Sequence, residues 1–238
     1  MKDFFRSRLA RFLFAVGLVV AGGVPTLAAP LIPFRAADLL GSTPEPFGLP
    51  TAALPVGALH DKWLAVERAI EDEMLVLALC EEAPSRCSSP AAKQFLGIVA
   101  DGRARDGRAR LGEINRALNL AVRAGDDLVL YGANDVWRSP LALLETGAGD
   151  CEDYAIAKYV ALRASGVAPE DLRIVILYDA RRHEDHAIAV ARLDGHWLML
   201  DNRRMAMVED INMFNVRPLF VIDHDGGVRP YLTRQSQL

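Results

Sequence analysis

The segment Gly147-Ala-Gly-Asp-Cys-Glu-Asp-Tyr-Ala155 places one thiol among three carboxylates. Cys151 follows Asp150 and precedes Glu152 and Asp153, so nearby negative charge opposes formation of the thiolate, the nucleophilic form of cysteine. The segment also reads as a helix start, where the Asp150 carboxylate can cap free backbone N–H groups and Cys151 takes the first helical position. The positive end of the helix dipole favours a thiolate there. Cys151 is therefore a candidate nucleophile that needs a base.

A β-hairpin further along the chain selects the base among the histidines. Its sequence is His-Ala-Ile-Ala-Val-Ala-Arg-Leu, the turn Asp194-Gly195, and then His-Trp-Leu-Met-Leu-Asp-Asn. With this turn, the register sets Ile188 opposite Asp201. His186 lies two residues before Ile188 on the same face, so it is a diagonal neighbour of Asp201, within roughly 7–8 Å at the backbone.

A histidine oriented by a carboxylate is what nucleophilic catalysis requires. The carboxylate fixes the tautomer and supports the imidazolium, and the imidazolium supports the thiolate. The pattern therefore predicts that Cys151, His186 and Asp201 act together. His196 points to the other face, about 23 Å along the strand from the level of His186. The alternative is that His186 and Asp201 begin and end strands without a shared role.

The chain has three cysteines, and two of them are close in sequence. Cys80 and Cys87 are separated by a segment containing Pro84, which helps the chain to turn, and we expect a local disulfide between them in an oxidising compartment. Cys151 is then the odd thiol. In an exported protein an unpaired cysteine suggests a catalytic nucleophile, and the alternative is a buried, inert cysteine.

The elements that must position these residues change character along the chain. Apolar spacing predicts helices from Asp61 to the Cys80–Cys87 turn and over 91–100, 111–122 and 151–166. The stretch Asp-Gly-Arg-Ala-Arg-Asp-Gly-Arg-Ala-Arg is expected to be a solvated connection, residues 125–140 a loop, and Ser139-Pro140 the start of a short helix. After Gly166, Leu-Arg-Ile-Val-Ile-Leu-Tyr predicts a buried strand, followed by the hairpin and a weaker second hairpin. Helices followed by an antiparallel sheet indicate an α+β fold.

The first residues indicate export. A basic start, an apolar run over 12–24 and small residues up to Ala28–Ala29 are the parts of a secretory signal peptide, which we assign to residues 1–28. The alternative, a membrane anchor, requires roughly 20 apolar residues, more than this run provides. An irregular arm follows over 29–58, and one domain over 59–238, with a helical part (59–166) and a sheet part (167–238).

The net charge argues against one class of partner. The chain has 27 basic and 31 acidic residues, and cleavage after Ala28 removes four basic residues and one acidic residue, which leaves 23 − 30 = −7. A net negative charge disfavours nucleic acid as a partner.

Three segments together resemble the bacterial transglutaminase-like cysteine proteinases. They are the segment from Tyr131 to Val167 that contains Gly-Asp-Cys-Glu-Asp, the strand Leu-Arg-Ile-Val-Ile-Leu, and the hairpin that ends in Leu-Asp-Asn. The likeness extends roughly from Trp63 to Tyr231. It implies a papain/transglutaminase-like fold, with Cys151 as nucleophile, His186 as base and Asp201 as the orienting acid. The Cys80–Cys87 pair is also similar to the family.

The same resemblance implies a cofactor, a substrate and a location. It implies Ca²⁺ dependence, with Asp150 and Glu152 in the matching ligand positions and Asp153 as their neighbour. Bound Ca²⁺, which prefers oxygen ligands, would neutralise carboxylates that otherwise oppose the thiolate. It further implies a periplasmic endopeptidase that cleaves a large surface adhesin near its N-terminus and is sequestered by an inner-membrane receptor.

Several alternatives stay open at this point. The acidic residues can be capping residues alone, and other ligands, such as backbone carbonyls, water or the Asn134-Asp135 loop, would have to complete a calcium shell. His183 and His186 are spaced for opposite faces of a strand, which argues against zinc. The enzyme could transfer an acyl group to an amine, as a transglutaminase does, or the chain could be an inert binding module on the same fold.

Overall fold

The computed structural model describes residues 45–54 and 56–232. The expected signal peptide, residues 1–28, lies outside these ranges, and so does the first part of the expected arm. Within the described residues no helix is long and apolar enough to cross a membrane.

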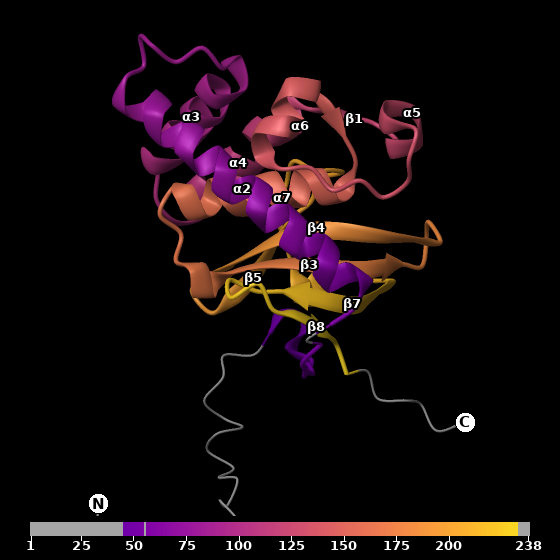
Figure 1. Ribbon diagram of the computed structural model, residues 1–238. Coiled ribbons are helices and arrows are strands. Elements are labelled where there is room, and N and C mark those ends of the chain that lie inside the picture. The colour runs from indigo at the N-terminus through magenta and orange to yellow at the C-terminus, as the bar shows by residue number, and fades with distance from the viewer. Residues whose placement is uncertain (1–44, 55, 233–238) are drawn as a thin grey trace, which may run out of the picture. The chain divides into compact units, whose positions relative to one another are not determined.

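Helices form the first half of the described chain and lie together on one side of a sheet (Figure 1). They are α2 (Ala58–Glu82), α3 (Pro90–Arg103), α4 (Gly107–Ala121), α5 (Asp127–Tyr131), α6 (Pro140–Thr146) and α7 (Cys151–Ala164). The short 3-10 helices are η1 (Pro46–Gly48), η2 (Pro169–Asp171) and η3 (Asp210–Asn212). The expected cap of α3 is confirmed, because the Ser89 hydroxyl accepts a hydrogen bond from the Ala92 N–H at 3.1 Å.

Two sequence expectations in the helical half were correct only in part. The expected solvated connection over 101–110 is limited to residues 104–106, because α3 continues to Arg103 and α4 already begins at Gly107. Arginine and alanine are good helix formers, which explains why both helices extend into it. The expected loop over 125–140 contains α5, a helix of a single turn whose start is capped by the Asp126 carboxylate.

The second half is an antiparallel sheet. Its strands are β3 (Leu172–Asp179), β4 (Glu184–Leu193), β5 (His196–Leu200), β6 (Val208–Glu209), β7 (Val216–Ile222) and β8 (Val228–Pro230). Within the described residues they lie in the order β6-β5-β4-β3-β7-β8. The predicted hairpin register is confirmed, since Leu193 pairs with His196 and Ala189 with Leu200.

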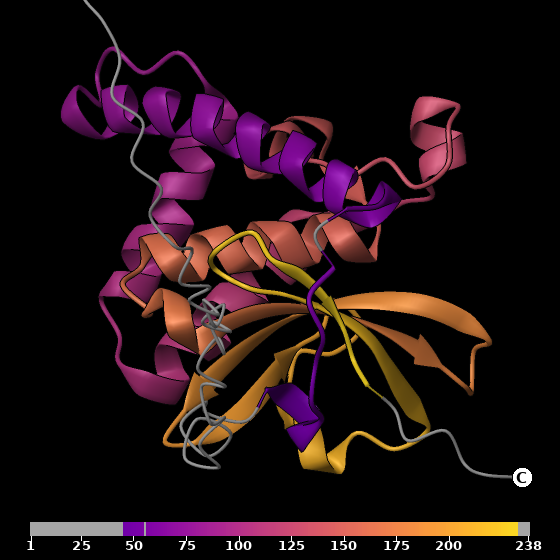
Figure 2. The same ribbon diagram turned by 60° about the horizontal axis from the view of Figure 1, so that its bottom comes forward.

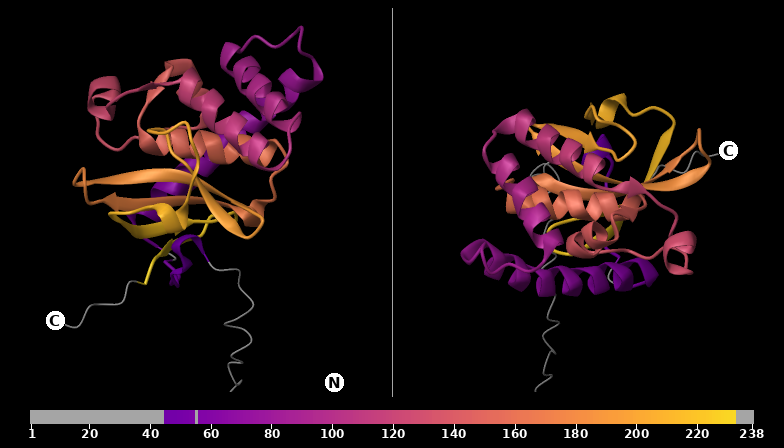
Figure 3. Two further views of the ribbon diagram at one scale, coloured as in Figure 1. Left: turned by 180° about the vertical axis from the view of Figure 1, so that it is seen from behind. Right: turned by 90° about the horizontal axis from the view of Figure 1, so that it is seen from above.

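Both faces of the two central strands are buried, as their continuous apolar sequences predict. On the helix-facing side, Leu172 and Ile174 of β3 and the alanines of β4 join a core made with α2, α3, α4, α6 and α7. The small alanines let α7 pack closely against β4, and two further views show α7 lying along the sheet (Figure 3).

The other face of the sheet is covered by the described part of the N-terminal arm. Phe47 and Leu49 pack against a second core that includes Val175, Ile188 and Trp197. Thr51 forms a bridge with Tyr231, so the arm is tied to the end of the sheet (Figure 2). Residues 45–54 of the arm therefore have a defined structure.

A disulfide links Cys80 to Cys87, as expected. It joins the last turn of α2 to the segment before α3. Both cysteines are buried in the helix-side core.

Candidate active site

Cys151 occupies the first residue of α7, as the sequence predicts. Two short parallel strands, β1 (Arg123–Ala124) and β2 (Ala148–Gly149), hold the segment before it. A Cβ atom on Gly149 would overlap the Asp153 carboxylate and the Leu143 side chain, which explains the glycine at this position. The thiol therefore lies at a tightly packed junction between a strand and a helix.

A half-buried glutamate supports this junction from α2. The Glu73 carboxylate accepts hydrogen bonds from the Ser139 hydroxyl and from the backbone N–H groups of Leu141 and Ala142, at 3.0 and 3.1 Å for the two backbone donors. These are free N–H groups of the first turn of α6. Glu73 thus caps α6, the helix that leads into the cysteine segment.

The predicted capping role of Asp150 was wrong. Asp150 is at the N-cap position, but its carboxylate accepts no capping hydrogen bond from α7. Its Oδ1 atom is buried and has no hydrogen-bond partner among the described residues. The carboxylate instead lies near those of Asp127 and Glu152, where it can serve a ligand.

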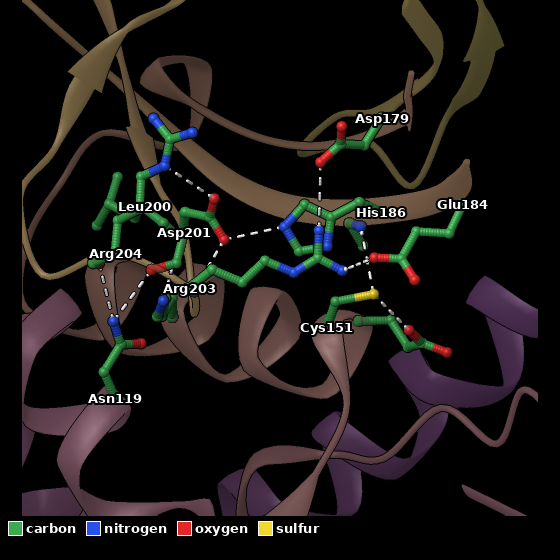
Figure 4. Close-up of polar contacts among 12 residues, drawn as sticks. Asn119, Cys151, Asp179, Glu184, His186, Leu200, Asp201, Arg203 and Arg204 are labelled. Atoms are coloured by element: carbon green, nitrogen blue, oxygen red, sulfur yellow. Dashed lines mark hydrogen bonds and ion pairs between the residues drawn. The ribbon is translucent and has the colours of Figure 1, made fainter. Parts of the chain in front are cut away.

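The sulfur of Cys151 contacts both a carboxylate and the strand that carries His186. The thiol donates to the Glu152 carboxylate at 3.1 Å, and Sγ accepts from the Ala187 N–H at 3.4 Å. Burial, and then the charge of Glu152, raise the pKa of the Cys151 thiol well above its ordinary value. In this arrangement the thiol is protonated, and it lies against the backbone of the residue that follows His186 (Figure 4).

His186 and Asp201 form the predicted pair. The His186 Nε2 atom and Asp201 Oδ1 are 2.9 Å apart, and both side chains are buried, with 3% and 5% of the residue exposed. The other ring nitrogen, Nδ1, is buried and has no hydrogen-bond partner among the described residues. This nitrogen is therefore free to exchange a proton with a group in the cleft.

Asp201 is held in an ionised form. Burial favours its neutral form, but the hydrogen bond and charge of His186, the Arg203 N–H at 3.0 Å and the charge of Lys158 together lower its pKa. The Arg203 side chain extends across His186 in Figure 4 and forms ion pairs with Glu184 at 2.5 Å and Asp179 at 3.6 Å. These contacts fix the start of β4, which carries His186.

On the other side of the thiol lie three carboxylates. Asp127, Asp150 and Glu152 each offer one ligand atom, and these atoms lie within 4.8 Å of one another. Asp127 lies on α5, and the sequence analysis did not identify it as a ligand. The only sequence signal for it was the Asp126-Asp127 pair, which lies at the start of this one-turn helix. Asp135, considered as a ligand from sequence, instead forms an ion pair with Lys62 and accepts from the Trp137 indole.

The electrostatics of this acidic group favour a bound cation. Burial and the charge of Glu152 raise the pKa of Asp150 to about 9. Burial also raises the pKa of Asp153 to about 7, although the hydrogen bond from the Arg138 N–H acts in the opposite direction. Asp127 Oδ1 and Asp150 Oδ1 are buried and without partners among the described residues. Closely spaced oxygen atoms of this kind are ligands that Ca²⁺ prefers, so the residues present fit the ion.

One cleft joins the two sides. It has a volume of ≈ 930 Å³, and its lining includes Cys151, His186, Asp127, Asp150 and Glu152. The thiol, the imidazole and the carboxylates are therefore open to the same substrate. His183 is not part of this arrangement, because it lies in the turn before β4 with its Nδ1 atom 3.3 Å from the Tyr178 hydroxyl.

Comparison with known proteins gives one sequence match and several structural ones. The model of the family described as bacterial transglutaminase-like cysteine proteinase matches residues 71–214, more than half of the chain. A search of curated proteins finds no match.

Among solved structures, Legionella pneumophila LapG is similar, with a TM-score of 0.54 and 20% identity over 68% of this chain and 88% of that chain. Calcium-bound LapG gives a TM-score of 0.55 and 21% identity over 68% of this chain and 93% of that one. EGTA-treated LapG gives a TM-score of 0.55 and 21% identity over 69% of this chain and 87% of that one. At these identities the likeness shows a shared fold.

Proposed function

The chain belongs to the bacterial transglutaminase-like cysteine proteinases, and from this premise we propose that Cys151, His186 and Asp201 form the catalytic triad of a calcium-dependent cysteine endopeptidase. The predicted α+β, transglutaminase-like fold and the prediction of a cysteine peptidase are confirmed by the family and by the LapG fold. The assignment of the three residues depends chiefly on one observation: His186, which is paired with the buried Asp201, lines the same cleft as the thiol at the start of α7.

The residues have separate tasks in this mechanism. The Cys151 thiolate attacks the peptide carbonyl carbon, and the oxyanion is held by N–H groups of the first turn of α7, which have no partner within the helix. The His186 imidazolium donates its proton to the leaving amine as the C–N bond breaks. Water, with His186 as base, then hydrolyses the thioester, while Asp201 remains ionised and keeps the ring oriented.

The three carboxylates beside the thiol, which form the acidic side of the site, would hold the metal. Asp127, Asp150 and Glu152 would ligate Ca²⁺ through carboxylate oxygens, and the bound charge would offset the negative charge beside the thiol. Glu152 now accepts a hydrogen bond from the thiol, so its engagement as a ligand would free Cys151 for the imidazole. The calcium-bound and EGTA-treated forms of LapG support this part of the proposal.

Substrate and location follow from the family resemblance and from the first residues of the chain. We propose export to the periplasm with removal of residues 1–28, cleavage of a large surface adhesin near its N-terminus in the control of biofilm attachment, and sequestration by an inner-membrane receptor. Export is tested by N-terminal sequencing of the protein from a periplasmic fraction, which should begin at Ala29. An uncut N-terminus in the membrane fraction would contradict the removal of residues 1–28.

The central experiment is proteolysis of adhesin N-terminal fragments by the wild type and by Cys151→Ala, with and without a calcium chelator. Cleavage by the wild type only, and only with calcium, is expected. Cleavage by the alanine variant would refute the mechanism, and indifference to the chelator would refute only the role of calcium. A lysine-like amine added to the assay separates hydrolysis from acyl transfer, because transfer would incorporate the amine into the substrate.

A further inference from the structure

A buried lysine lies behind the proposed triad and has no task in the mechanism above. Lys158 is on α7, seven residues after Cys151 and so on the same face of the helix. It is completely buried, with 0% of the residue exposed. Among the described residues, no carboxylate lies within ion-pair distance of its amine. Removing an amine from water in this way costs free energy, so the residue would destabilise the fold unless its contacts offset that loss.

The amine reaches the end of the strand that leads to Asp201. Its Nζ atom donates a hydrogen bond to the backbone carbonyl of Leu200 at 3.1 Å, and it lies 5.7 Å from the centre of the Tyr154 ring. Leu200 is the last residue of β5 and directly precedes Asp201 (Figure 4). Lys158 thus connects the helix that begins with the nucleophile to the residue before the orienting acid.

Helix α4 holds the next carbonyl. The Asn119 side-chain amide donates to the carbonyl of Asp201 at 3.0 Å and to that of Arg204 at 3.1 Å. The consecutive carbonyls of Leu200 and Asp201 are therefore held by side chains from two different helices. The lysine also acts through charge: burial, partly offset by the charge of Asp201, lowers the pKa of Lys158 to about 7, and the Lys158 charge in turn helps to lower the pKa of Asp201.

We propose that Lys158 is a positioning residue for catalysis: its hydrogen bond to the Leu200 carbonyl fixes the end of β5, so that Asp201 stays oriented toward His186, and its charge acts on Asp201 from beyond ion-pair distance. The inference rests on the proposed triad. A purely structural role, in which the alkyl stem fills the core, makes a different prediction, because a methionine would fill the same space equally well.

The first test compares Lys158→Met with Leu162→Met. Both substitutions place methionine at a fully buried position of α7, four residues apart on the same face, but only the first removes an amine. For Lys158→Met we expect a fall in kcat of roughly 10- to 100-fold, the range typical of residues that orient a catalytic ligand, with KM and the calcium-induced rise in Tm unchanged. Equal kcat values for the two variants would overturn the inference.

The second test reads Asp201 directly. The carboxyl ¹³C resonance of Asp201, assigned by its loss in Asp201→Asn, is titrated in the wild type and in both methionine variants. The pKa of Asp201 should rise in Lys158→Met and stay unchanged in Leu162→Met; an unchanged pKa in Lys158→Met would overturn the inference. If Lys158→Met does not fold, Lys158→Gln, which keeps a hydrogen-bond donor without the charge, is titrated in its place with the same expectation.

A double-mutant cycle separates failure of this inference from failure of the triad. The rate of Cys151 alkylation by iodoacetamide is measured for Lys158→Met, Asp201→Asn and the double variant. If the lysine acts through Asp201, it adds no further loss when Asp201 is replaced; independent, multiplying losses would overturn the inference. A normal rate in Asp201→Asn would refute the triad itself, whereas a loss there with a normal rate in Lys158→Met would refute only the role of the lysine.

Discussion

Cys151 lies between two groups of buried or half-buried polar side chains, whose hydrogen-bonding capacity the protein satisfies to different degrees. On the histidine side, the Asp201 carboxylate accepts hydrogen bonds from His186 and from the Arg203 N–H, and its pKa is lowered. On the acidic side, Asp127 and Asp150 each have a buried oxygen without a partner in the described part of the chain, and the pKa of Asp150 is raised by burial and by the charge of Glu152.

The two sides are also built differently. The histidine side is formed by β4 and the end of β5, two strands whose register fixes how their side chains meet. The acidic side is formed by the start of α7 and the one-turn helix α5, which projects from the helical layer (Figure 2). The comparison indicates that the carboxylate of the first side is satisfied by the protein's own residues, with the His186 Nδ1 atom left unpaired, whereas the second side requires a ligand to be stable in its ionised form.

The largest expected effect comes from breaking the histidine side. Cys151→Ala should abolish proteolysis, and Asp201→Asn or His186→Ala should lower kcat by roughly 10²- to 10⁴-fold, because general acid–base catalysis is lost. His196→Gln is a matched control, since His196 comes from the same hairpin and lies 3.4 Å from a Glu209 oxygen but is exposed. Loss of activity in the control, or near-normal kcat in Asp201→Asn, would contradict the assignment.

Breaking the acidic side should remove the effect of calcium. At a calcium concentration 100 times Kd, binding to the folded state alone stabilises it by about 2.7 kcal/mol. Asp127→Asn and Asp150→Asn should lose most of this gain because each neutralises one ligand, whereas Asp126→Asn, an adjacent carboxylate outside the group, should keep it. The measurement is urea unfolding with calcium or with chelator, and an undiminished gain in Asp127→Asn would exclude that residue as a ligand.

The sequence was informative where a repeating pattern fixes geometry. The Asp194-Gly195 turn set the hairpin register, and with it the neighbourhood of His186 and Asp201, because strands have a period of two residues. It was uninformative where contacts depend on packing. Asp127 lies on a helix of one turn, too short to show a period, and no local pattern indicates that the Asp150 side chain turns away from its own helix toward a carboxylate of α5.

The two sides should respond to pH with opposite signs. The folded-state pKa of Asp201 is below its unfolded value, so its contribution to stability is present above about pH 3.8 and is lost as pH falls through the folded value. The pKa of Asp150 is raised from 3.8 to about 9, so in chelator stability should fall as pH rises across that window.

Urea unfolding between pH 4 and 9 measures the contribution of Asp150, because the contribution of Asp201 changes only below about pH 3.8. Calcium should reduce the decrease in unfolding free energy with rising pH, because the ion favours the ionised carboxylates. Asp150→Asn should reduce the same decrease in the absence of calcium. If the free energy of unfolding changes with pH by the same amount in the wild type and in Asp150→Asn, Asp150 is not the group whose titration causes the change.

The smallest effect on catalysis is expected far from both sides. The Cys80–Cys87 disulfide closes a loop with a sequence separation of 7. Replacing both cysteines by alanine should lower the free energy of unfolding by about 2 kcal/mol, mainly through the unfolded chain, while kcat stays unchanged. A fall in kcat at a temperature where the variant is fully folded would show that this region is coupled to the site.

The most direct test of the account is the pH dependence of Cys151 alkylation by iodoacetamide in the presence of calcium, compared between the wild type and His186→Ala. If the imidazole generates the thiolate, the wild type should react between pH 5 and 8 and the variant only at alkaline pH. Identical profiles for the two proteins would contradict the claim that His186 activates Cys151.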